Sequence, residues 1–227
     1  MSVEYPRSIR SFVIRAGRLT DAQRRALEEL WPRFGLEFDA QLLDLDAVFG
    51  RRAPRVVEIG FGNGEHLAAM AAQRPEHDFL GIEVHPPGVG RLLLALAATN
   101  LHNVRVSAHD AVEVLETQIP HDSLDEVQIL FPDPWHKKRH HKRRLIQSPF
   151  ADCVARRLKT GGLLRLATDW EPYAEHMRQV LDASLLLENV ASGGGFLEGL
   201  RERAPTRFER RGERLGHAIR ELAYRRR

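Results

Sequence analysis

The chain has little of what several protein classes require. Its 227 residues include one cysteine, Cys153, so no internal disulfide can form and a reducing compartment is expected. Its longest apolar runs, such as Leu92–Ala98, are far shorter than the ~20 residues of a membrane-spanning helix. The first residues show no apolar core behind a basic start, as a secretory signal would. We therefore expect a cytoplasmic protein without a membrane span.

A complete set of metal ligands is also missing. His136 and His140 have H-x-x-x-H spacing, but neither His141 nor Cys153 belongs to a C-x-x-C or other second ligand pair, as a zinc site would require. We therefore expect no metal, and we expect Cys153 to pack inside a helix.

Hydrophobic residues make up 43% of the chain, and their pattern changes near residue 50. Residues 1–50 form a basic extension in which Thr20-Asp-Ala-Gln23 has the pattern of a helix capping box, with the helix ending near Trp31 and Pro32. In residues 51–227 apolar strands alternate with helices, which predicts a parallel sheet covered on both faces. Strands are expected at 55–60, 78–83, 104–107, 124–131, 163–168, 185–190 and 217–224, and helices at 65–74, 90–100, 111–118, 145–158 and 172–181. We predict an α/β fold with a doubly wound, mostly parallel, seven-stranded sheet in the domain 51–227, preceded by the extension 1–50.

A glycine-rich turn follows the first predicted strand. The segment Glu58-Ile-Gly60-Phe-Gly62-Asn-Gly64 lets a ligand approach the backbone and face the start of the next helix. Its G-x-G-x-G spacing differs from the G-x-G-x-x-G of dinucleotide-binding proteins, which disfavours a nicotinamide-dependent oxidoreductase. A purely structural turn is the alternative.

Acidic residues follow the next two strands. Ligands of such sheets bind at the carboxyl ends of the strands, so Glu83 is placed to accept hydrogen bonds from ribose hydroxyls and Asp110 from an adenine amine. The alternative for each acid is an ordinary helix N-cap.

The fourth strand leads into Leu130-Phe-Pro-Asp-Pro-Trp-His136, where two prolines fix the turn around Asp133. A basic run, Lys137–Arg144, follows at once, and more arginines lie between Arg201 and Arg227. Such clusters indicate a phosphate-binding surface, whereas a solvated helix face is the alternative. Trp135 and Trp170 could stack on a base or pack in the core.

These segments resemble the bacterial tRNA (guanine-N7-)-methyltransferase family over nearly the whole chain. The similar stretches are Glu58-Ile-Gly-Phe-Gly62, Gly81-Ile-Glu-Val-His85, Pro87-Gly-Val-Gly90, Phe131-Pro-Asp-Pro-Trp-His136, Thr168-Asp-Trp-Glu171 and Thr206-Arg-Phe-Glu209, with Arg10-Ser-Phe-Val-Ile-Arg15 and Gly17-Arg-Leu-Thr20 near the start. The most specific is Phe-Pro-Asp-Pro-Trp-His followed by basic residues. Arg207 stands where the family more often has lysine, so its planar fork is expected to change the contact in detail.

The resemblance implies the class I, Rossmann-like methyltransferase fold and transfer of a methyl group from S-adenosylmethionine to N7 of the guanine at position 46 of tRNA. The implied cofactor-binding residues are Glu58, Gly60, Gly62, Glu83, Asp110 and Asp133, of which Asp133 is also the implied catalytic residue. The implied substrate-binding residues are Lys137, Asp169, Thr206, Arg207, Phe208 and Glu209. The residues implied to contact RNA are Arg139, His140, His141, Lys142, Arg143 and Arg144.

The chemistry is consistent with these roles. Guanine N7 has a free lone pair and no proton, so the reaction needs positioning more than a general base. Asp133 would stabilise the cationic purine, and Asp169 or Glu209 could accept hydrogen bonds from its Watson–Crick edge. The alternatives are the same fold acting on another RNA or on a small molecule, and an RNA-binding protein whose cofactor site is inactive. A monomer and a homodimer both stay open.

Overall fold

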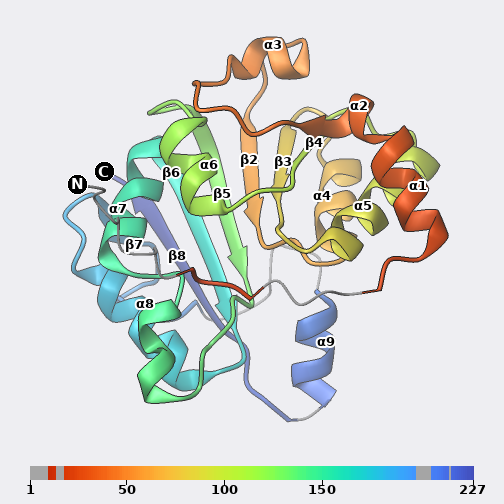
Figure 1. Cartoon of the computed structure of the whole chain (residues 1–227). Helices are drawn as coiled ribbons and strands as arrows, with labels where there is room; N and C mark the ends of the chain where they lie inside the picture. Colours follow the sequence, from red (N-terminus) through yellow and green to blue (C-terminus); the bar gives the residue numbers. More distant parts are fainter. Residues whose placement is uncertain (1–9, 14–17, 198–205, 215) are drawn as a thin grey trace, which may run out of the picture.

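The computed structural model describes residues 10–13, 18–197, 206–214 and 216–227 (Figure 1). These residues form one eight-stranded sheet of order β1-β4-β3-β2-β5-β6-β8-β7. The strands are β1 (Gly35–Leu36), β2 (Arg55–Ile59), β3 (Asp78–Ile82), β4 (Val104–Ser107), β5 (Leu124–Leu130), β6 (Leu158–Thr168), β7 (Leu187–Asn189) and β8 (Arg220–Arg226). Only β8 runs antiparallel to its neighbours β6 and β7 among these pairs, so the predicted mostly parallel α/β sheet is confirmed.

The sheet has one strand more than the seven expected. Gly35 and Leu36 of the extension pair in parallel with Val106 and Ser107 of β4. A strand of two residues is too short to show a period-two pattern, so it could not be predicted from the sequence.

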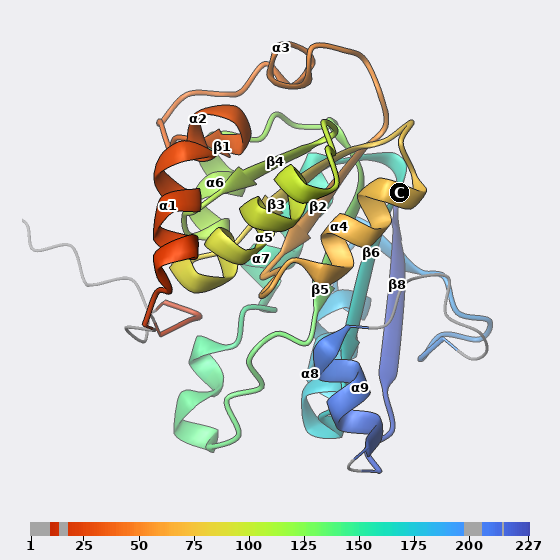
Figure 2. The ribbon, with the colours of Figure 1, turned by 90° about the vertical axis from the view of Figure 1, so that its right-hand side faces the viewer.

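Helices cover both faces of the sheet (Figures 1 and 2). They are α1 (Asp21–Glu29), α2 (Trp31–Phe34), α3 (Leu45–Phe49), α4 (Glu65–Gln73), α5 (Pro86–Ala98), α6 (Ala111–Thr117), the 3₁₀-helix η1 (Lys138–Arg143), α7 (Ser148–Arg157), α8 (Glu171–Asp182) and α9 (Arg207–Arg214). Neighbouring residues of a strand pack into the hydrophobic cores on opposite faces of the sheet, because side chains alternate along a strand. Val56 packs with α1, α4 and α5, and Val57 packs with α6, α7 and α8. No helix in the described part of the chain is long and apolar enough to cross a membrane.

The largest differences between predicted and observed boundaries are at α5 and β6. Helix α5 begins at Pro86 rather than near Gly90, because prolines are tolerated in a first turn whose N–H groups have no intrahelical partner. Strand β6 begins at Leu158 rather than Leu163, and Gly161 lies within it with φ 85°. The glycines there accompany an irregularity in the pairing with β5 and do not form a loop. Helices α2, α3, α9 and η1 were not predicted, and α1 ends at Glu29 rather than near Trp31 and Pro32.

The extension packs closely on the domain. Helix α1 begins with the predicted capping box at Thr20 and lies beside α5 in both views (Figures 1 and 2). A Cβ added to Gly90 would lie 2.9 Å from Cβ and 3.0 Å from the carbonyl oxygen of Gln23. The Gln23 amide also donates to the Pro87 carbonyl at 3.0 Å. Glycine at position 90 therefore lets the two helices meet at backbone distance.

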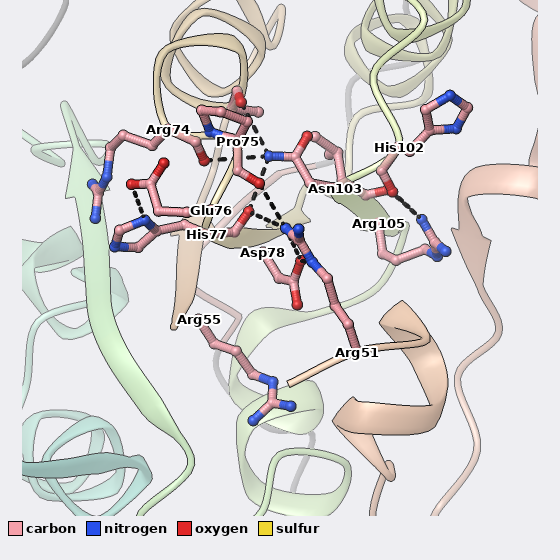
Figure 3. Close-up of polar contacts among 12 residues, drawn as sticks. Arg51, Arg55, Arg74, Pro75, Glu76, His77, Asp78, His102, Asn103 and Arg105 are labelled. Atoms are coloured by element: carbon pink, nitrogen blue, oxygen red, sulfur yellow. Dashed lines mark hydrogen bonds and ion pairs between the residues drawn. The ribbon is translucent and has the colours of Figure 1, made fainter. Parts of the chain in front are cut away.

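A polar network fastens the amino-terminal end of the sheet (Figure 3). Arg51 donates to the buried Asp78 carboxylate at 2.8 Å and to the carbonyls of Pro75 and His77 at 2.8 and 3.1 Å. The Asn103 amide donates to the His77 carbonyl at 2.9 Å. In both whole-chain views α3 lies at this end of the molecule and α9 at the other, below the carboxyl ends of the strands (Figures 1 and 2).

Candidate active site

A pocket of about 910 Å³ lies at the carboxyl ends of β2, β3, β4 and β5. It brings together seven residues predicted to be functional, which are Gly60, Gly62, Glu83, Asp110, Asp133, Lys137 and His140. One continuous space therefore joins the glycine-rich turn to the start of the basic run. Glu58, Asp169, Thr206 and Glu209 are not among its lining residues.

The glycine-rich turn has a backbone that other residues would adopt only with strain. Gly60, Gly62 and Gly64 have φ of 73°, 58° and 73°, in the left-handed region. Gly60 N–H donates to the Ile82 carbonyl at 2.8 Å, which ties the turn to β3. The glycine-rich turn therefore connects the end of β2 to the start of α4 while it is hydrogen-bonded to the end of β3.

The Glu83 carboxylate is held by three backbone N–H groups. Its Oε1 accepts from Val84 at 2.8 Å and His85 at 3.0 Å, and its Oε2 accepts from Gly62 at 2.9 Å. A carboxylate offers about four acceptor positions, so one remains, on Oε2. The sequence suggested that this acid accepts from both ribose hydroxyls, whereas these contacts leave room for one.

Asp110 caps α6 and also lines the pocket. Its Oδ1 accepts from Val112 N–H at 3.0 Å, as in the N-cap alternative, and burial raises the pKa of its carboxyl above the usual value. Beside it His109 lines the pocket, with its ring stacked on Phe38 at 3.7 Å between centroids and its Nε2 bonded to Glu113. The sequence analysis missed His109, although it directly precedes Asp110 after the same strand.

S-adenosylmethionine, the cofactor expected from the sequence, suits these hydrogen-bond acceptors. Its ribose hydroxyl and adenine amine are donors that match the open acceptor of Glu83 and the second oxygen of Asp110. Helix α5 also packs tightly against the turn, since a Cβ on Gly88 would lie 2.2 Å from the Gly62 carbonyl oxygen. These acids around a cationic sulfonium are electrostatically favourable.

The loop after β5 presents Asp133 between two strained residues. Phe131 and Trp135 have φ of 55° and 47°, values that bulky residues rarely adopt. Each such residue costs about 1–3 kcal/mol and persists only where its surroundings enforce it. The exposed Asp133 side chain therefore stands on a loop of fixed shape at the pocket wall.

Trp135 also links the pocket to the extension. Its indole N–H donates to the Ser11 carbonyl at 3.0 Å, and Ser11, Phe12 and Val13 line the pocket. The Arg143 guanidinium lies 5.1 Å from the Trp135 ring centre. Trp135 thus joins the loop, the extension and the basic helix, a role that no local sequence pattern indicated.

The basic run contains both exposed cations and an anchor. Arg139 and Lys142 are exposed on η1. Arg144, predicted to contact RNA, is 4% exposed, and its Nε donates to the Pro134 carbonyl at 3.0 Å. Its guanidinium also lies 4.8 Å from the Tyr173 ring centre. Arg144 thus fastens the base of the loop, and in this position it presents little surface to RNA.

Titratable neighbours of this anchor and of η1 have shifted pKa values. Burial raises the pKa of Tyr173 to about 12, so its hydroxyl stays protonated. Desolvation, followed by the repulsion of nearby cations such as Arg139 and Arg143, lowers the pKa of His140. Lysine and arginine, rather than His140, therefore supply positive charge to η1 at neutral pH.

Apart from Lys137, which lines the pocket, the predicted substrate residues form a second cluster around α9. Thr206 and Glu209 make a capping box, with Thr206 N–H donating to Glu209 Oε2 at 3.2 Å and Glu209 N–H donating to Thr206 Oγ1 at 3.1 Å. Asp169 follows β6, and its Oδ2 would lie 3.1 Å from a Cβ on Gly212 of α9. The side chains of Arg207 and Phe208 lie outside the described residues.

An ion pair also holds α9 beside the glycine-rich turn. Arg210 of α9 reaches Glu65, the first residue of α4, at 3.1 Å.

Two other residues named from the sequence are not among the residues that line the pocket. Glu58 is buried and pairs with His66. Cys153 is buried in α7, as expected. Over the described ranges no group of three or more His, Cys, Asp or Glu side chains could hold a metal ion.

Two kinds of sequence comparison give the same result. A family described as "Putative methyltransferase" matches residues 52–222. A protein of Leifsonia xyli subsp. xyli is 58% identical over 216 residues, which are 95% of each chain. One of Ectopseudomonas mendocina is 55% identical over 220 residues, 97% of this chain and 92% of its own. Both are named tRNA (guanine-N(7)-)-methyltransferase.

Solved structures share the fold at low sequence identity. An rRNA methylase from Streptococcus thermophilus has a TM-score of 0.51 at 11% identity, covering 77% of this chain and 87% of its own. The antibiotic-resistance methyltransferase Kmr has a TM-score of 0.54 at 14% identity, covering 86% and 98%. The fold is therefore that of Rossmann-like methyltransferases, as predicted.

Proposed function

This chain belongs to the tRNA (guanine-N(7)-)-methyltransferase family, and we propose that it transfers a methyl group from S-adenosylmethionine to N7 of the guanine at position 46 of tRNA. The observation that supports this most directly is the shared pocket. Glu83 and Asp110 offer acceptors at one end, and Asp133 and Lys137 stand at the other. A volume of about 910 Å³ lies at the upper end of ordinary ligand pockets, which suits a nucleoside donor together with a flipped base.

The residues of the chain have few covalent steps to perform. When bound, S-adenosylmethionine supplies the methyl group, whose S–C bond breaks as the N7–C bond forms. Gly60, Gly62, Glu83 and Asp110 hold the donor, and Asp133 provides a negative charge where the purine becomes cationic. No proton leaves N7, so Asp133 acts by electrostatics and position.

Recognition of the guanine edge is better suited to Asp169 than to Glu209. Glu209 is 0% exposed and accepts from Thr206 N–H, so its carboxylate is already committed to the α9 capping box. The Asp169 side chain is 36% exposed, with the His217 ring at 3.3 Å from its Oδ2. We therefore assign to Asp169 the acceptor for the N1–H and N2–H groups of guanine, with Glu209 shaping α9.

We further propose that residues 51–227 form the catalytic domain and that residues 1–50 form an extension that completes its pocket. The protein is proposed to act in the cytoplasm. The packing of α1 on α5 and the pocket contacts of Ser11, Phe12 and Val13 support this division of labour. A monomer and a homodimer are both compatible with this proposal.

The proposed function is tested by methyl transfer to unmodified tRNA transcripts. We expect one N7-methylguanosine per tRNA, mapped to position 46, and no transfer when that guanine is replaced by adenine. Transfer to a ribosomal RNA fragment at an equal or higher rate would favour the alternative of another RNA substrate. Product at any other position of the tRNA would contradict the assignment.

The affinity for tRNA is expected to fall steeply with salt concentration. Contacts between η1 and phosphates should account for part of this salt dependence. Each phosphate neutralised contributes about 0.7–0.9 to the slope of log K against log salt. Replacing the exposed Arg139 and Lys142 with alanine should therefore flatten the slope by roughly 1.4–1.8 in titrations between 50 and 200 mM salt. The matched control is Arg52→Ala, an exposed arginine at the opposite end of the sheet, which should leave the slope unchanged. An unchanged slope in the double variant would remove η1 from the RNA surface.

A further inference from the structure

Glu58 is buried, is not among the residues that line the pocket, and closes the base of the glycine-rich turn. Its side chain is 4% exposed, and its Oε2 lies 2.9 Å from Nδ1 of His66, whose side chain is 3% exposed. Glu58 belongs to β2, and His66 belongs to the first turn of α4. The two residues therefore stand at the two ends of the turn, residues 59–65, and bond to each other across it inside the core.

The protonation of the His66 ring follows from its partners. A carboxylate has only acceptor oxygens, so Nδ1 must carry the shared hydrogen. Within the described residues Nε2 is buried and has no hydrogen-bond partner. A proton on Nε2 would be an unpaired buried donor, which is more costly than an unpaired lone pair. These partners favour the tautomer of His66 that is protonated on Nδ1.

The turn that this pair closes contains three glycines. Gly60, Gly62 and Gly64 all have left-handed φ, and glycine loses more conformational entropy on ordering than any other residue. The position of the turn also contributes to the orientation of Glu83, because Gly62 N–H donates to its Oε2. A fixed base of the turn thus fixes an acceptor of the donor site.

We propose that His66 is a positioning residue of the donor site, which holds Glu58 through its Nδ1–H and thereby keeps the glycine-rich turn and Glu83 in their binding geometry. This inference rests on the proposed function, since S-adenosylmethionine is taken as the donor. His66 touches neither donor nor RNA in this role. Its loss is expected to weaken donor affinity while leaving the affinity for tRNA unchanged.

Leucine and asparagine at position 66 form a matched pair for the test. They have nearly the same shape, but the asparagine amide nitrogen stands as many bonds from the backbone as Nδ1 and can donate to Glu58. By calorimetry with S-adenosylmethionine, His66→Leu should bind about 10–100-fold more weakly than the wild type, the effect of losing a hydrogen bond to a charged group. His66→Asn should stay within about threefold of the wild type, because its neutral amide N–H can still donate to the Glu58 carboxylate. Equal affinity in the leucine variant, or equal loss in both variants, would overturn the proposal.

A measurement on the wild type decides the question if the leucine variant does not fold. ¹⁵N spectroscopy of the imidazole should show His66 protonated on Nδ1 and bare on Nε2, with ring and Gly60–Gly64 amide signals shifting together as the donor is added. A ring protonated on Nε2, or one that does not respond, would overturn the proposal. Wild-type protein that takes up no S-adenosylmethionine would instead sink the proposed function. Normal wild-type uptake with an unaffected leucine variant would sink only the role of His66.

Discussion

Replacing Asp133 with asparagine is expected to lower kcat for tRNA methylation by about 10²–10³-fold, the loss seen when one preorganised electrostatic contact to a transition state is removed. Asparagine keeps the shape and one acceptor oxygen, so the loop and the donor contacts should survive. What disappears is the negative charge beside a purine that becomes cationic. The measurement is single-turnover methyl transfer with saturating S-adenosylmethionine, so that kcat and donor binding are separated.

The control for this change is Asp122→Asn, an exposed acid in the loop before β5, at the opposite end of that strand. It removes the same charge from the protein and should leave both kcat and donor affinity near the wild-type values. Near-normal turnover by Asp133→Asn would mean that positioning alone carries the reaction. Loss of donor affinity without loss of kcat would make Asp133 a binding residue only.

The sheet was predictable because its strands are buried on both faces. Runs such as Val56-Val57 and Leu80-Gly81-Ile82 are continuously apolar, and each is separated from the next by a helix-length segment. Strand β1 and helix α9 lacked such signals. Strand β1 is a two-residue pairing made by the extension, and α9 is dominated by charged residues, so no apolar period marks it.

The residues of the pocket could be predicted only where they come directly after the end of a strand. Glu83, Asp110 and Asp133 each come just after a strand, so topology alone places them together. Glu58 precedes its strand end by one residue, which points its side chain into the core and not toward the pocket. The burial of Arg144 depends on a tertiary contact with Tyr173, which no local pattern contains.

Adding a single methyl group at Gly88 is expected to weaken donor binding. Alanine is ordinarily favoured over glycine in a helix by about 0.5–1 kcal/mol. Here its Cβ would lie 2.2 Å from the Gly62 carbonyl oxygen, which is backbone and cannot rotate away. Overpacking of this kind costs about 1–3 kcal/mol, so the clash outweighs the helix preference and the glycine-rich turn must move. We expect Gly88→Ala to weaken S-adenosylmethionine binding at least about tenfold, as 1.4 kcal/mol would.

Gly90→Ala is the matched control, since it makes the same change two residues further along α5. Its Cβ would meet Gln23 of α1 at 2.9 Å rather than the donor turn. Both variants should therefore lose thermal stability, each by about 2–4 °C per kcal/mol for a chain of this size. Only Gly88→Ala should also lose donor affinity, because only there does the displaced backbone carry the N–H that orients Glu83. If calorimetry gave equal donor affinities for the two variants, close packing of α5 on the turn could not be what shapes the donor site.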